Sequence, residues 1–170
     1  MRARRSVLAW LAGAACAMSA PDTSLAGQPQ PSAADGGLAA IATLTGTCER
    51  LVVAGEEKTD GCRAMIGNTI YRTGRSGFTF FVDGDSGLVL TFSGADSAAE
   101  GDQATIVLDK IVFTPTGPLQ ETTVLRAAGR CTYTNPYIGP SRVDCSASTE
   151  SGRYSATFIS DGRPPEGEQP

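Results

Sequence analysis

Four cysteines, arranged as two equally spaced pairs, constrain this chain more than any other feature. Cys48 and Cys62 are 14 positions apart, and so are Cys131 and Cys145. Four cysteines permit three disulfide connectivities, and the equal spacing favours the two local pairs, Cys48–Cys62 and Cys131–Cys145. A zinc site is the less favoured alternative, because the sequence has no histidine and no closely spaced cysteine pair. The pattern predicts a small domain stapled by two disulfides, which is typical of exported proteins.

The remaining cysteine, Cys16, lies in an N-terminal segment with the three-part pattern of a secretory signal peptide. Three arginines precede an uncharged apolar run over residues 7–17, and small residues follow. That run is shorter than the roughly 20 residues that a membrane-spanning helix needs, and no later run is longer. We therefore expect cleavage after Ala26, a periplasmic or secreted protein and no membrane span. A lipid anchor on Cys16 is the alternative.

Composition divides the rest of the chain into three parts. Residues 27–39 are rich in Pro, Gly, Ser and Ala and predict a disordered linker. Residues 40–162 hold the four paired cysteines and predict one folded domain. The polar, proline-rich residues 163–170 predict a disordered tail.

Short β-branched and aromatic runs, separated by turn residues, recur throughout the predicted domain. The runs cover residues 43–53, 69–73, 77–82, 88–92, 104–113, 122–125, 130–134, 142–148 and 153–160. Turn formers separate them, among them Asp83-Gly84 and Ser93-Gly94, and residues 96–103 predict an acidic loop. The pattern predicts an all-β fold, a single antiparallel sandwich or barrel of about eight or nine strands stapled by disulfides.

A faint internal repeat links the two cysteine pairs. Each pair begins with Gly-x-Cys, and the motif Thr-Phe-x-x-Asp-Gly follows at residues 79–84 and again at 157–162. The repeat predicts a hairpin closed by a disulfide and then a hairpin that ends in Asp-Gly, although matches this short also arise by coincidence in β proteins. In these motifs, residues 44–162 resemble small exported two-disulfide β proteins of Gram-negative bacteria. The resemblance implies this layout, and it assigns no activity and no functional residue.

Charge and residue types exclude several classes of function. Removal of residues 1–26 takes away three arginines and Asp22, which leaves 11 basic and 17 acidic side chains and a net charge of −6. A nucleic-acid-binding protein would carry a basic patch instead. Without histidine, neither a Ser-His-Asp nor a Cys-His nucleophile can form. A hydrolase using two carboxylates is the remaining enzymatic alternative, and its candidate acids are Glu49, Glu56, Glu57, Glu121 and Glu150.

One glycine-rich acidic segment, residues 83–87, has the residue types of a calcium loop. An EF-hand loop that began at Asp83 would need glycine at its sixth position and an acid at its twelfth, but Leu88 and Gly94 stand there. We therefore interpret Asp83 and Asp85 as part of a turn between two strands, with calcium binding as the alternative. We expect no cofactor.

The segment at residues 133–140 is the candidate recognition loop. It places Tyr133, Asn135, Tyr137 and Ile138 among proline and glycine residues that restrict the backbone. Rigid aromatic side chains bind partners at low entropic cost, and the alternative is that Tyr133 and Ile138 only cap the core. We expect a non-enzymatic binding or interaction module whose partner is a protein or a cell-envelope ligand. An inhibitor-like protein that presents disulfide-stapled loops is one form of such a module.

Overall fold

The computed structural model describes residues 37–84, 87–116 and 121–168, and the fold is built from strands. The expected signal peptide, the Cys16 anchor and most of the expected linker lie outside these residues, as does Asp85. No helix in the described ranges is long and apolar enough to cross a membrane. The elements are β1 (Leu38–Val53), β2 (Glu56–Glu57), a 3-10 turn (Thr59–Gly61), β3 (Cys62–Tyr71), β4 (Arg75–Val82), β5 (Leu88–Glu100), β6 (Gln103–Pro115), β7 (Thr123–Thr134), β8 (Arg142–Thr149), β9 (Gly152–Ser160) and β10 (Glu166–Glu168).

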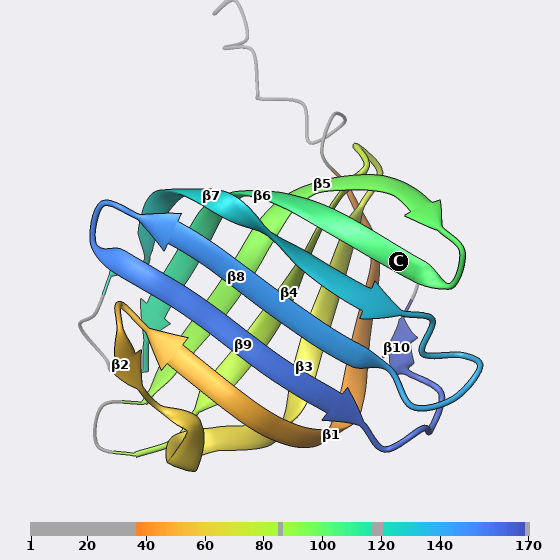
Figure 1. The fold of residues 1–170 in the computed structure, drawn as a ribbon, viewed down its shortest axis with the longest axis horizontal. Coiled ribbons are helices and arrows are strands. Elements are labelled where there is room, and N and C mark those ends of the chain that lie inside the picture. The colour runs from red at the N-terminus through yellow and green to blue at the C-terminus, as the bar shows by residue number, and fades with distance from the viewer. Residues whose placement is uncertain (1–36, 85–86, 117–120, 169–170) are drawn as a thin grey trace, which may run out of the picture. The chain divides into compact units, whose positions relative to one another are not determined.

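Eight of these strands close into an antiparallel barrel. The order runs β1-β3-β4-β5-β6-β7-β8-β9, and β9 returns to pair with β1. Figure 1 shows β7, β8 and β9 crossing in front of β3 and β4. The expectation of one antiparallel β domain is confirmed, and of the two architectures it left open, the structure is the barrel.

The long strand β1 makes the closure possible because it changes partner part-way along. Residues 38–45 pair with β3, whereas residues 46–52 pair with β9. Gly46 stands at the change of partner, and a Cβ atom there would lie 2.0 Å from the carbonyl oxygen of Ile159. Only glycine allows two backbones to approach so closely, as sharply bent barrel corners require.

The β5–β6 hairpin differs from two sequence expectations. Ser93-Gly94 is not a turn, because β5 continues through it with a bulge opposite β6. A Cβ atom on Gly94 would lie 1.9 Å from the carbonyl oxygen of Val107, so this glycine serves strand approach and not chain reversal. Residues 96–103 are not an acidic loop either, since the strands extend until only Gly101 and Asp102 separate them. Backbone pairing tolerates the acidic side chains there because they are exposed to solvent.

Side chains of alternating direction fill the middle of the barrel. In β4, Phe78, Phe80 and Val82 are buried, while Thr79 and Phe81 between them are half-buried. The same alternation in the other strands gives one core cluster. Its largest fully buried members are Phe78, Phe80, Phe92, Phe158, Leu51, Ile66, Leu90, Ile106, Ile111 and Val143.

The two disulfides join the cysteines that the spacing pairs. Cys131 and Cys145 face each other across β7 and β8, with Cα atoms 4.0 Å apart, and both lie in the core. Cys48 and Cys62 join β1 to β3 with Cα atoms 6.0 Å apart, and both are half-buried. The segment between Cys48 and Cys62 is more than a simple hairpin turn, because β2 and the 3-10 turn lie within it.

The C-terminal segment departs from the expected disorder over residues 163–170. Glu166–Glu168 forms β10, which pairs with residues 41–43 of β1. This part of β1 lies beyond the end of β9, so its backbone would otherwise be an unpaired edge. At the start of the connection, the Thr45 hydroxyl donates to the Asp161 carboxylate at 2.8 Å, and the Asp161 carboxylate also accepts from the Arg163 backbone N–H at 2.9 Å.

A candidate binding site at one mouth of the barrel

Small inward-facing residues leave one end of the barrel interior open. Ala42 shares a row with Asn68 and the buried Phe78, and Ala104 shares a row with Tyr133 and the buried Val143. Because registered neighbours on antiparallel strands point to the same face, both alanines point inward. A cavity of about 420 Å³ lies above the core at this mouth.

Aromatic and aliphatic side chains form the floor of the cavity. Phe78 and Tyr133 meet edge to face, with ring centroids 5.1 Å apart and an interplanar angle of 76°. Leu44 and Ile70 also line the cavity. Burial, and to a smaller extent the nearby charge of Asp96, raises the pKa of the Tyr133 hydroxyl above its ordinary value. The hydroxyl is therefore neutral at physiological pH, and the floor is uncharged.

Two chain segments form the rim. From one side come Asn135, Pro136 and Tyr137, and from the other come Gly101 and Asp102 of the β5–β6 hairpin. The Asn135 side-chain oxygen accepts from the Tyr137 backbone N–H at 2.9 Å, which fixes the turn beneath Tyr137. The Tyr137 side chain is 68% exposed, so most of its surface is available to a ligand.

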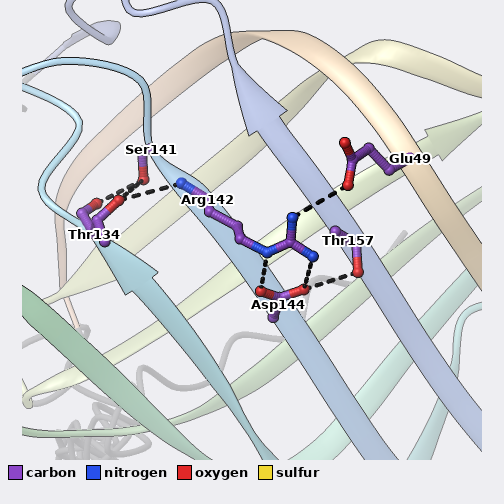
Figure 2. A network of polar contacts seen from close by, with 6 residues as sticks. All are labelled: Glu49, Thr134, Ser141, Arg142, Asp144 and Thr157. Carbon is purple, nitrogen blue, oxygen red and sulfur yellow. Dashed lines mark hydrogen bonds and ion pairs between the residues drawn. The ribbon is translucent and has the colours of Figure 1, made fainter.

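Hydrogen bonds at the base hold the loop of residues 135–141 in place. The Ser141 hydroxyl donates to the Thr134 carbonyl oxygen at 2.6 Å, and the Arg142 backbone N–H donates to the Thr134 hydroxyl at 3.2 Å, as Figure 2 shows. The Ser141 backbone N–H donates to the Ser160 hydroxyl at 2.7 Å, and the Ser160 backbone N–H returns a bond to the Ser141 carbonyl at 2.8 Å. The fully buried Ser141 thus ties this loop to the end of β9.

An ion-pair network next to this base braces the barrel closure. Arg142 of β8 contacts Asp144 on its own strand at 2.6 Å and Glu49 of β1 at 3.2 Å. Thr157 of β9 donates to Asp144 at 2.8 Å, so the network spans the three strands that meet at the closure (Figure 2). Hydrogen bonding to Asp144 is the main cause that raises the pKa of Arg142. Arg142 and Glu49 are exposed, Asp144 and Thr157 are half-buried, and all four belong to the scaffold of the mouth.

The polar groups of the cavity include both hydrogen-bond donors and acceptors, since Asn135 uses its oxygen for the Tyr137 N–H and keeps its amide nitrogen as a donor. The Asn68 side-chain nitrogen donates to the Gly77 carbonyl oxygen at 3.1 Å, which leaves the amide oxygen as the acceptor of this lining residue. Asp102 adds a carboxylate at the rim. Asp96, near Tyr133, accepts a short hydrogen bond from the buried Ser76 hydroxyl. Among the described residues that line the cavity there is no lysine and no arginine.

The structure brings three of the four expected binding residues to this one cavity. Tyr133, Asn135 and Tyr137 line it, whereas Ile138 is not among its described lining residues and is 72% exposed. Sequence reasoning missed Asn68 and Asp102. Asn68 lies opposite Ala42, one of the small residues of β1, and this neighbourhood would have marked it as a lining residue. The sequence does not show the neighbourhood, because it depends on the register between β1 and β3.

A wider cavity of about 830 Å³ lies at the opposite mouth. Val53, Leu88, Phe113 and Tyr154 are among its lining residues. Its lining residues Gly84, Gly87 and Thr116 are next in sequence to residues outside the described ranges. We place the candidate site at the first mouth, where three of the four expected binding residues lie.

The other residues with candidate chemistry lie elsewhere. Arg63 contacts the Asp83 carboxylate at 2.6 Å, and this hydrogen bond is the main cause that lowers the pKa of Asp83. Within the described ranges, no group of three or more metal-ligating side chains converges. Two of the candidate acids belong to separate ion pairs, Glu49 with Arg142 and Glu56 with Lys58.

No protein-family model, curated protein or solved structure matches this chain. The candidate site is therefore argued from its own geometry.

Proposed function

We propose that this protein is a non-enzymatic binding protein of the periplasm or the extracellular space, whose ligand occupies the 420 Å³ barrel mouth. The observation that carries the proposal is the combination of a cavity left open by inward-facing alanines with a rim loop held at both its turn and its base. A side chain as large as those of the core would fill the positions of Ala42 and Ala104.

The size and rigidity of the mouth suit a small ligand. Sites for small molecules occupy roughly 300–1,000 Å³ and are mostly apolar with a few placed polar groups. A barrel of eight strands is just wide enough to hold one such ligand. Because hydrogen bonds already order residues 135–141, a ligand that contacts Tyr137 would incur little further loss of loop entropy.

Two features support export. The N-terminal sequence has the pattern of a cleaved leader. The two disulfides suit an oxidising compartment outside the cytoplasm.

A protein partner is the second candidate, and the loop tip favours it. Tyr137 and Ile138 stand side by side in sequence and are 68% and 72% exposed. Such a pair could insert into a partner in the manner of an inhibitor loop. Glu49 and Glu56 give no support to the alternative of a carboxylate hydrolase, because such an enzyme needs two carboxylates that converge on one cleft and these two belong to separate ion pairs.

Native mass spectrometry of the protein isolated from the cells that produce it tests the proposal. We expect a chain that begins at Gly27 and carries a non-covalent small-molecule adduct that denaturation releases. Ala42→Leu and Ala104→Leu, which fill the mouth from opposite walls, should lose the adduct. Ala128→Leu is the matched control, because Ala128 is exposed on β7 away from the cavity, and it should keep the adduct.

Two results would contradict the proposal. One is an adduct that the two mouth variants retain as well as the control variant does. The other is a chain with its leader attached and no adduct, which would contradict both the proposed compartment and the proposed ligand. Far-ultraviolet circular dichroism of each variant checks that the barrel still forms.

A further inference from the structure

We propose that the ligand class of the barrel mouth is a small amphiphilic organic cation, an alkyl or aryl amine with its apolar body in the cavity and its charged nitrogen at the rim beside Asp102. This inference rests on the proposed function, and it assigns the chemistry of the site.

The deep part of the cavity is suited to an apolar body. The buried Leu44 and Phe78 supply hydrocarbon and aromatic surface, and Ala42 and Ala104 supply space. Burial of apolar ligand surface there is favourable by about 25 cal/mol for each Å² removed from water. A strongly polar ligand such as a sugar would lose its hydration against these walls without gaining enough hydrogen bonds.

The rim is suited to a positive charge. Asp102 lines it with a carboxylate, and Tyr137 offers an exposed aromatic face from the opposite segment. A cation near an aromatic face is attracted by the quadrupole of the ring, and more strongly when the cation is desolvated. A carboxylate and an aromatic ring together are the groups that recognise alkylammonium ions.

The charged group of the described lining is acidic, and the neutral polar groups do not oppose a cation. The Asn68 amide nitrogen donates to the Gly77 carbonyl and its oxygen is an acceptor, whereas the Asn135 oxygen is occupied and its nitrogen is a donor. The Ser141 hydroxyl is used up as a donor to Thr134. The charge of Asp96 acts on Tyr133 at the cavity floor, where it contributes to the raised pKa of the tyrosine hydroxyl. An anionic ligand would meet these negative groups without any basic side chain from the described lining.

Calorimetric titration with three probes of equal chain length tests the assignment. The probes are octyltrimethylammonium, octanol and octanoate, which share an eight-carbon chain and differ in the charge and the size of the head group. We expect the cation to bind about tenfold more tightly than the alcohol, a difference of about 1.4 kcal/mol, and octanoate to bind most weakly. All three should lose affinity in Ala104→Leu.

A charge-matched pair of variants locates the preference. Asp102→Asn should reduce the affinity for octyltrimethylammonium toward that for octanol and leave the octanol affinity unchanged. Glu150→Gln is the control, because Glu150 lies in the exposed β8–β9 turn near the opposite mouth, and it should change neither affinity.

The outcomes separate the ligand class from the proposed function. Equal binding of the three probes, tightest binding of octanoate, or a cation preference that survives Asp102→Asn would overturn the class. Each leaves the binding function standing as long as Ala104→Leu still abolishes binding. Failure of all three probes to bind, with the mouth-dependent native adduct intact, would also overturn the class alone.

Discussion

At the scale of single residues, Gly94 tests whether the close approach of β5 and β6 requires a glycine. In Gly94→Ala the added Cβ would lie 1.9 Å from the Val107 carbonyl oxygen, so β5 and β6 must separate. We expect a loss of about 1–3 kcal/mol in the free energy of unfolding, measured by urea denaturation.

Gly67→Ala is the matched control for that substitution. Gly67 also lies within a strand, but a Cβ atom there would meet Thr79 at 3.6 Å, an ordinary van der Waals distance. We expect a change of less than about 1 kcal/mol. Equal losses in the two variants would show that Gly94 does not mark a tight strand approach.

Tyr133 links the floor of the cavity to the pH dependence of stability. Burial raises the pKa of its hydroxyl, so the folded protein keeps the proton at pH values where the unfolded chain has released it. The contribution of this buried neutral hydroxyl to the free energy of unfolding is present below about pH 10, the ordinary tyrosine pKa. It is lost as the pH rises through the pKa of the folded state. Ultraviolet titration of tyrosinate should therefore show a late-ionising group that Tyr133→Phe removes.

The companion variant for this titration is Tyr154→Phe. Tyr154 also has a raised pKa, chiefly from burial, but it lies at the opposite mouth. The Tyr154→Phe variant should remove a different part of the tyrosine ionisation seen above the ordinary pKa, and it should leave ligand binding unchanged. If Tyr133→Phe removed only signal at the ordinary pKa, the burial of this hydroxyl in the cavity floor would be contradicted.

The sequence pointed to Tyr133, Asn135 and Tyr137 because aromatic, proline and glycine residues stand together in one short segment. It could not point to Asn68, whose role depends on which strand β3 faces and in which register. An asparagine in a β run looks like any other polar position until its inward direction is known.

At the scale of the elements, the two disulfides differ in burial although their loops are equal in length. Each closes a loop of about 15 residues, worth about 3 kcal/mol in the chain-entropy model. Cys131 and Cys145 lie in the core, while Cys48 and Cys62 are half-buried. We expect a water-soluble thiol reductant to open Cys48–Cys62 first, observed by timed alkylation and peptide mapping.

Reversed order, or simultaneous reduction of both bonds, would contradict this account of their environments. Reduction in denaturant is the control, because there the two equal loops should open at similar rates. Recovery of a peptide that joins Cys48 to Cys131 or Cys145 would contradict the pairing itself.

Strand existence was predictable from the sequence, but strand length was less so. Runs of β-branched residues located the first part of β5 and nearly all of β6. Strand β5 then extends through polar residues to Glu100, and β6 extends by one residue to Gln103 at one end and by two to Pro115 at the other. Backbone pairing between neighbours sustains these extensions, and composition does not report it. For the same reason β10 was missed, since it forms to pair with an open part of β1.

At the scale of the whole molecule, closure by β1 and β9 decides the architecture. Alternating burial predicts one covered face, which both a sandwich and a barrel provide. The distinction depends on pairing between residues 46–52 and 155–160, which are more than a hundred positions apart. Local sequence patterns carry no signal for such a contact. Closure also creates the mouth, because it brings β1, β3, β6 and β7 around one cavity.

Nuclear magnetic resonance mapping of bound octyltrimethylammonium tests the central claim, that the mouth is the binding site, most directly. The account predicts that backbone amide shifts concentrate at Ala42, Asn68, Ala104 and Tyr137, with intermolecular contacts from the octyl chain to Phe78. Amides at Glu150 and Ser151, near the opposite mouth, should stay unchanged. Shifts centred on the opposite mouth or spread evenly over the barrel surface would contradict the account.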